Sequence, residues 1–147
     1  MVELKIRVID ARAKADLAEL KYHISDYNEI AVKRAAEYVR GVVQKNFLRG
    51  PRPEKLNVRT ARLINSVDTE TIREGDDTRA YIGTNARSDS GYNYPAYWEY
   101  DGSKHGGPRP FLRPAVEEYR DRWTAVWVKS LKQQVEKFIA YVDMKHA

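Results

Sequence analysis

The feature that most constrains this chain is a run of apolar side chains at helical spacing near its C-terminus. They recur every three or four positions and so share one face of a helix: Val116, Tyr119, Trp123, Val126, Trp127, Leu131, Val135, Phe138 and Val142. Pro114 suits the first turn, where the amide that proline lacks is unpaired in any helix. Roughly 28 residues at 1.5 Å each make a helix about 40 Å long, about the width of a domain of this size. The remaining elements therefore have to pack along one long helix.

The N-terminal part predicts a strand followed by helical structure. Apolar and charged residues alternate from Val2 to Val8, the period of a half-buried strand. Apolar residues at helical spacing then predict helix between 13 and 47. Ser25-Asp26 interrupts this pattern, and Asp26 with Glu29 resembles a capping box, whose side chains bind the free amides of a new helix. The pattern leaves open whether this segment is one bent helix or two.

The middle of the chain predicts a β-hairpin. Residues 67–72 are rich in β-branched side chains, Glu74 to Asp77 provide turn residues, and Thr78 to Thr84 is the expected return strand. The expected fold class is α+β: a small antiparallel sheet packed against a long C-terminal helix and an N-terminal helical segment. The length of 147 residues fits one domain over 1–147.

Composition narrows the functional classes. The chain contains no cysteine, which excludes disulfides, thiol catalysis and thiolate metal sites. No apolar run approaches the roughly 18 residues of a membrane-spanning helix, and the N-terminus lacks the apolar stretch of a signal peptide. A soluble protein made in a cytoplasm is expected.

The most basic segment lies between 45 and 62. We expect a flexible loop at about 49–59, and the residues in and beside it that are candidates for binding a partner are Arg49, Arg52, Lys55 and Arg59. With a formal net charge of +5, an anionic partner such as nucleic acid is one possibility. A solvated linker is the other interpretation of the same residues.

A second candidate surface lies in a segment rich in glycine and proline, expected to be a long flexible loop with some ordered pieces at about 85–108. Its candidate partner-binding residues are Tyr92, Tyr94, Trp98, Tyr100 and Lys104, with Tyr97 among them in the sequence. Tyrosine and tryptophan favour protein interfaces, and beside basic residues they also stack on single-stranded bases. Packing against the core is the third interpretation.

The sequence offers little from which to build an enzyme. The three histidines lie in different segments without metal-ligand spacing, and no phosphate-binding glycine loop or nucleophile elbow is present. Glu99 and Asp101 form a conceivable carboxylate pair with His105 as a base, but carboxylates at that spacing on a polar loop are usually only solvated. We expect no catalytic activity, no cofactor and no metal.

Four segments together resemble the tail-completion, or head–tail joining, proteins of long-tailed phages and prophages. Thr60 to Val67 is similar to the family's Thr-Gly-Arg-Leu-x-x-Ser-Ile segment, with Ala61 in place of glycine. Tyr81 to Asn85 is similar to the Val-Gly-Thr pattern that ends a strand in the family. Tyr94 to Ser103 resembles Tyr-Ala-x-Tyr-x-Glu-Phe-Gly-Thr, with Asp101 as an extra residue. Arg109 to Ala115 reproduces Arg-Pro-Phe-Leu-Arg-Pro-Ala without change.

The resemblance implies a structural virion protein of the neck, in a ring expected to be hexameric between the head connector or adaptor and the tail terminator. The motif residues it marks as structural are Thr60, Arg62, Leu63, Gly83, Tyr97, Glu99, Gly102, Arg109, Pro110, Phe111, Leu112, Arg113 and Pro114. Joining depends on interfaces rather than on catalysis. The alternative function is a small basic nucleic-acid-binding domain, and DNA contact is also conceivable as an incidental part of the neck role.

Overall fold

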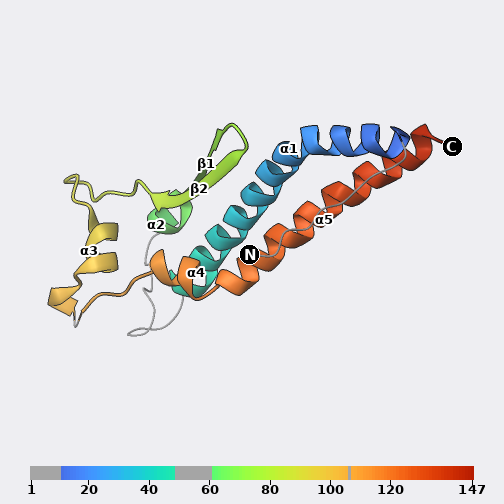
Figure 1. Cartoon of the computed structure of the whole chain (residues 1–147). Helices are drawn as coiled ribbons and strands as arrows, with labels where there is room; N and C mark the ends of the chain where they lie inside the picture. The colour runs from blue at the N-terminus through green and yellow to red at the C-terminus, as the bar shows by residue number, and fades with distance from the viewer. Residues whose placement is uncertain (1–10, 49–60, 106) are drawn as a thin grey trace, which may run out of the picture.

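Two long helices that lie side by side form the body of the molecule (Figure 1). The computed structural model describes residues 11–48, 61–105 and 107–147. Helix α1 (Ala11–Val42) continues into a π-helical turn, η1 (Val43–Phe47), and helix α5 (Arg120–Lys145) runs back along it. The start of α1 is tied to the end of α5, because Nε2 of His146 lies 3.0 Å from the Asp16 carboxylate and Nζ of Lys145 lies 3.2 Å from that of Glu19. The two helices are therefore antiparallel.

The region predicted as one helix or two is one helix, which bends along its length (Figure 1). The predicted capping box at Asp26 and Glu29 is wrong, because both residues lie inside α1. Arg73 of the hairpin binds both carboxylates, and the Ser25 hydroxyl donates to the Asp76 carboxylate at 2.6 Å. The hydrogen bonds to Asp26 and Glu29 raise the pKa of Arg73. These polar residues thus attach the hairpin to α1 rather than start a helix.

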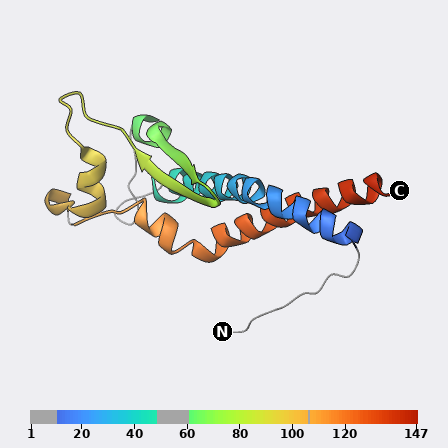
Figure 2. The same ribbon diagram turned by 45° about the horizontal axis from the view of Figure 1, so that its top comes forward.

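The predicted hairpin is confirmed, with strands β1 (Val67–Glu74) and β2 (Asp77–Thr84) paired antiparallel. Val67 lies opposite Thr84 and Glu74 opposite Asp77, so the turn is tight. Gly75 takes a φ of +61° in that turn, a conformation that costs glycine little. The hairpin lies along α1 (Figure 2), and the Arg40 guanidinium of α1 donates to the Val67 carbonyl at 3.0 Å.

The C-terminal helix is interrupted where the sequence predicts continuity. Helix α4 (Arg113–Glu117) ends before Tyr119, and α5 begins at Arg120. The Trp123 indole N–H donates to the Val116 carbonyl at 2.8 Å, and the Tyr119 hydroxyl accepts from the Asn46 amide at 3.0 Å. The Tyr119 ring also meets Phe47 edge-on. These contacts with η1 and across the break compensate the lost turn, which helical periodicity alone does not reveal.

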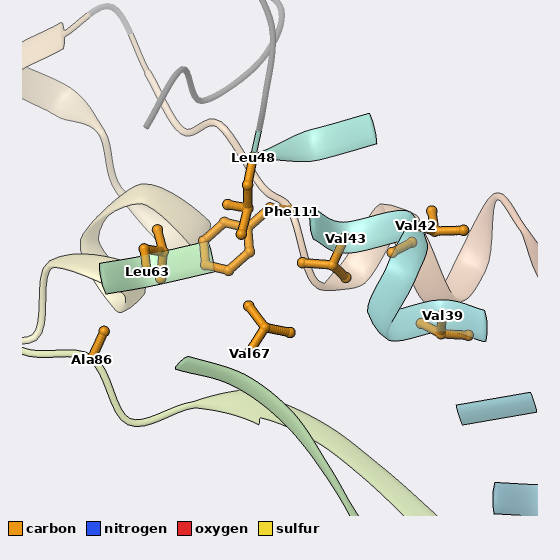
Figure 3. Packing of buried hydrophobic residues seen from close by; sticks show 9 residues of the cluster. Val39, Val42, Val43, Leu48, Leu63, Val67, Ala86 and Phe111 are labelled. Atoms are coloured by element: carbon orange, nitrogen blue, oxygen red, sulfur yellow. The ribbon is translucent and has the colours of Figure 1, made fainter. Parts of the chain in front are cut away.

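The core gathers around Phe111, whose ring points among side chains from α1, η1, the short helix α2 (Ala61–Ser66) and β1 (Figure 3). The buried members of this cluster are Val39, Val42, Val43, Leu48, Leu63, Val67, Ala86, Phe111 and Ala115. The expected α+β class, a small antiparallel sheet with a long helix from each end of the chain, is confirmed. The strand predicted over Val2 to Val8 lies outside the described residues.

Replacement of Phe111 by alanine tests the position of this core. Phe111 is fully buried, so the Phe111→Ala variant loses the packing of a whole ring and should lower the free energy of unfolding by about 3–5 kcal/mol. Ile139→Ala is the matched control, because Ile139 on α5 is half exposed. This substitution should change the free energy of unfolding by less than about 0.5 kcal/mol. Urea unfolding followed by circular dichroism measures both, and equal effects would contradict the assignment.

Candidate protein-interaction site

The segment 85–112, here called the α3 lobe, extends from the helical body (Figures 1 and 2). The sequence predicts a loop at 85–108, but this segment contains helix α3 (Tyr94–Tyr100) and the 3-10 turn η2 (Ser103–His105). The Asn93 side chain caps α3 by accepting the Ala96 amide at 3.2 Å, and Pro95 lies in the first turn. Helix α3 and η2 are ordered pieces within the expected loop, and the glycine and proline content concealed the capped helix start.

The Glu99 carboxylate joins the α3 lobe to the start of α4. Its Oε2 accepts the main-chain amides of Phe111 at 2.8 Å and Leu112 at 3.1 Å, and its Oε1 accepts that of Arg113 at 2.9 Å. These amides precede or begin α4 and have no acceptor within that helix. Glu99 is 7% exposed, and the three bonds compensate the cost of burying its charge. A carboxylate at a helix N-terminus is also favoured by the helix dipole.

Two glycines close the end of the lobe. Gly102 has a φ of +60°, its amide donates to the Tyr97 carbonyl at 2.9 Å, and its carbonyl accepts the Gly107 amide at 3.0 Å. A Cβ on Gly102 would lie 2.0 Å from the Gly107 oxygen, so the site excludes every side chain. Glycine is therefore required at 102 both by the backbone conformation and by the close approach.

The predicted interface aromatics divide into two groups. Tyr94 and Trp98 are half buried against the core cluster, and the Arg109 guanidinium lies 5.2 Å from the centre of the Trp98 ring. Tyr97 meets Trp98 edge-on, and its hydroxyl accepts the Lys104 amide at 3.0 Å. These contacts hold the lobe together, as the core interpretation of the aromatic residues predicts.

The second group faces solvent. The Tyr100 side chain is 71% exposed and that of Tyr92 is 56% exposed. The Arg113 guanidinium lies 6.0 Å from the centre of the Tyr100 ring, and Lys104 is exposed nearby in sequence on η2. Exposed tyrosines beside cations are typical of residues that form protein contacts. Tyr92, Tyr100 and Lys104 thus stay available for a partner.

The other motif residues serve different roles. Arg62 Nη1 reaches the Arg87 carbonyl at 3.2 Å and the Asp89 carboxylate at 3.0 Å, while Leu63 is buried in the core. Gly83 lies on β2 with open space around a Cβ, so neither backbone nor packing requires glycine there. Leu112 is half buried beside the core and Pro114 is buried in the first turn of α4, whereas Pro110 is exposed. The predicted residues Arg49, Arg52, Lys55, Arg59 and Thr60 lie outside the described part of the chain.

Arg40 and Gln44 help to position the site but carried no sequence signal, whereas Ser66 and Thr84 lie in two of the motif segments. The Gln44 amide of η1 donates to the Ile64 carbonyl at 2.9 Å, and the Ser66 and Thr84 hydroxyls bond each other across the base of the hairpin. Together with the hydrogen bond from Arg40 to the Val67 carbonyl, these bonds fix α2 and β1 against the end of α1. Single polar residues on a helix match no motif, and their partners become neighbours only in the folded chain.

The geometry and the comparisons both bear on what this site can do. The Glu99 carboxylate is occupied by three amides, which disfavours the conceivable role of Glu99 as a catalytic acid or base. Among residues 11–48, 61–105 and 107–147 no group of three potential ligands gathers at metal-binding distance, and no helix there is long and apolar enough to cross a membrane. No protein-family model, curated protein or solved structure matches the chain.

The Glu99 junction is tested by Glu99→Gln, which preserves size and leaves one acceptor oxygen in place of two. The new NH₂ group faces a main-chain amide donor, so the variant should lower the free energy of unfolding by about 2–3 kcal/mol. The control is Glu117→Gln, because Glu117 is exposed on α4 and the substitution removes the same charge. This control should change the free energy of unfolding by less than about 0.5 kcal/mol. Chemical denaturation of both variants gives the comparison, and a Glu99→Gln variant as stable as the control would refute the junction.

The close approach at Gly102 is tested against a glycine that has the same backbone requirement but free space. Gly91 has a φ of +81° and no atom lies near the position of a Cβ. Gly91→Ala should therefore lower the free energy of unfolding only by the strain of the left-handed backbone, about 1–2 kcal/mol. Gly102→Ala adds the clash with Gly107 and should cost at least about 2 kcal/mol more than Gly91→Ala. Thermal unfolding measures the difference, and equal costs would show that the backbone relaxes without penalty.

Proposed function

We propose that this chain is a structural component of the neck of a tailed phage, where it joins the tail to the head connector as part of a ring. The observation that supports this most is that residues of the scattered motifs converge in space. Leu63, Phe111 and Ala115 meet in one core cluster, and Glu99 binds the main chain of the Arg109 to Ala115 motif. Such a network explains why these residue types occur together in one chain.

The arrangement also suits a joining role. The motif residues stabilise the α3 lobe from within, while Tyr92 and Tyr100 on its surface stay exposed. A lobe that is held by its own contacts and presents rigid aromatic side chains loses little conformational entropy when it binds. Contacts of this kind suit a protein whose work is to bind neighbours in an assembly.

The nucleic-acid alternative has less support in the lobe. Stacking on single-stranded bases needs several free aromatic faces beside basic side chains. Here Trp98 is half buried and covered by Arg109, and Tyr94 packs against the core. The two exposed tyrosines offer more to a protein partner than to a nucleic acid.

Particle assembly without this protein tests the proposal. In a phage that encodes this chain, its removal should leave DNA-filled heads and finished tails that do not join, because the connection between them is missing. Electron microscopy of lysates and a count of infectious particles measure this. Complementation by the Tyr92→Ala/Tyr100→Ala chain should restore less joining than complementation by Tyr141→Ala, which alters a half-exposed tyrosine on α5.

Two results would refute the neck role. Joined, infectious particles formed without the protein would show that it is not needed for the connection. Affinity for DNA that falls steeply with salt, together with normal joining, would favour the nucleic-acid alternative.

A further inference from the structure

Helix α5 buries polar residues and leaves apolar residues in contact with solvent. Ser130 and Gln134 are 2% and 9% exposed, and the Ser130 hydroxyl accepts from the Arg34 guanidinium of α1 at 3.1 Å. By contrast, Val128 and Ile139 on the same helix are 49% and 52% exposed. A buried polar residue with a partner is accounted for by that partner, whereas a row of exposed apolar side chains is not accounted for within the molecule.

The exposed apolar residues belong to one continuous row along α5. At about 100° per residue, its members lie within about 80° of one another around the helix, and we call them the α5 stripe: Val128, Leu131, Val135, Ile139 and Val142. Leu131, Val135 and Val142 are partly exposed, so the whole stripe is accessible. It extends over about 21 Å at 1.5 Å per residue. A stripe of this kind is typical of a helix that packs against another helix.

The spacing of the α5 stripe is the same in both directions from Val135. Leu131 and Ile139 lie four positions on either side of it, and Val128 and Val142 lie seven. When two copies of α5 pack antiparallel about Val135, Leu131 of each copy meets Ile139 of the other, and Val128 meets Val142. A two-fold contact requires such self-complementarity, because both copies contribute the same patch. The stripe therefore fits a second copy of itself.

The charges beside the stripe are self-complementary in the same way. One side of the stripe turns toward α1, and the other side carries four exposed charged residues: Lys129, Lys132, Glu136 and Asp143. None of these four forms an ion pair with another described residue. In the antiparallel arrangement Lys132 comes within two positions, about 3 Å along the axis, of Glu136 of the second copy. Lys129 comes equally near Asp143, so each charge meets one of opposite sign.

We propose that the α5 stripe is the interface of a two-fold dimer, in which α5 packs antiparallel against α5 of a second copy about Val135. Both copies use the same patch, so the contact closes at two chains. The α3 lobe lies away from this part of α5 (Figures 1 and 2), and the dimer therefore leaves the exposed tyrosines of the lobe free. The proposal goes beyond the neck role and does not depend on it.

Sedimentation equilibrium of the purified chain measures the dimer. Ile139→Glu places a carboxylate against Leu131 of the other copy twice in each dimer. It should raise the dissociation constant at least about 100-fold, because an unpaired charge is costly to bury. The matched control is Ala140→Glu, which adds the same charge one position along, outside the stripe, and should change the dissociation constant less than about threefold. Both side chains are exposed, so both variants should fold, which circular dichroism verifies.

Charge exchange tests the orientation of the two helices. Lys132→Glu alone and Glu136→Lys alone each bring like charges together and should weaken the homodimer by about threefold to tenfold. A mixture of the two variants restores opposite charges at both places and should form a mixed dimer about as tight as the natural one. High salt should reduce these differences. A mixture that associates no more tightly than either variant alone would overturn the antiparallel arrangement.

Single cysteines report the register, because the natural chain contains none. Val135→Cys lies beside its own counterpart at the two-fold axis and should give a cross-linked dimer with a short bismaleimide. Val128→Cys lies about 21 Å along the axis from its counterpart and should not cross-link to itself. It should instead cross-link to a Val142→Cys chain in a mixture. Efficient cross-linking of Val128→Cys to itself would contradict the proposed register.

The remaining outcomes also decide the proposal. A natural chain that stays monomeric up to millimolar concentration would overturn it, and a dimer that Ile139→Glu does not weaken would show that a different surface associates. Ile139 lies in the stripe, so the unfolding control Ile139→Ala is measured at a concentration below the dissociation constant. Failure of the neck role would instead appear in particles that lack the protein, without any change in the self-association of the purified chain.

Discussion

The Glu99 carboxylate is the point on which the arrangement of this molecule depends. By accepting the amides of Phe111, Leu112 and Arg113, it fixes the end of α3 to the start of α4. Phe111 is thereby held where its ring lies within the core cluster (Figure 3), and α4 leads into α5 (Figure 1). A buried carboxylate with three main-chain donors tolerates little displacement, because any lost bond leaves a buried charge undercompensated. The orientation of the α3 lobe relative to the body follows from this junction.

The hairpin depends on a different kind of attachment. Its base is buried beside the core through Val67, but toward the turn it is connected to α1 by Arg73, Ser25 and the carboxylates that they bind. Exposed ion pairs of this type contribute little stability each and are weakened by salt. The hairpin is therefore firmly held at its base and more weakly at its turn.

Periodicity in the sequence was sufficient to predict the two long helices and the hairpin, but not α3 or the junctions between elements. Alternation over 67–84 gave the hairpin with its turn, because a two-residue period with a glycine at the turn has few alternative structures. Asp26 and Glu29 matched a helix cap by spacing, yet they bind Arg73 from 44 or more residues away. The break at Tyr119 likewise depends on Asn46 and Phe47. Patterns within one segment carry no information about partners that only the folded chain brings close.

The candidate site shows the same division. The sequence grouped Tyr92, Tyr94, Trp98 and Tyr100 as equivalent interface residues, but burial separates them. Tyr94 and Trp98 are four positions apart and share one face of α3, whereas Tyr100 lies two positions further on and Tyr92 precedes the helix. The sequence marked Glu99 as a motif residue and as half of a conceivable carboxylate pair, but its role follows from three distances that no pattern predicts. The motif residues that hold the fold and the tyrosines that face solvent are therefore distinct here. The fold constrains Glu99, Gly102 and Phe111 through buried contacts, while the side chains of Tyr92 and Tyr100 face solvent and carry no such constraint.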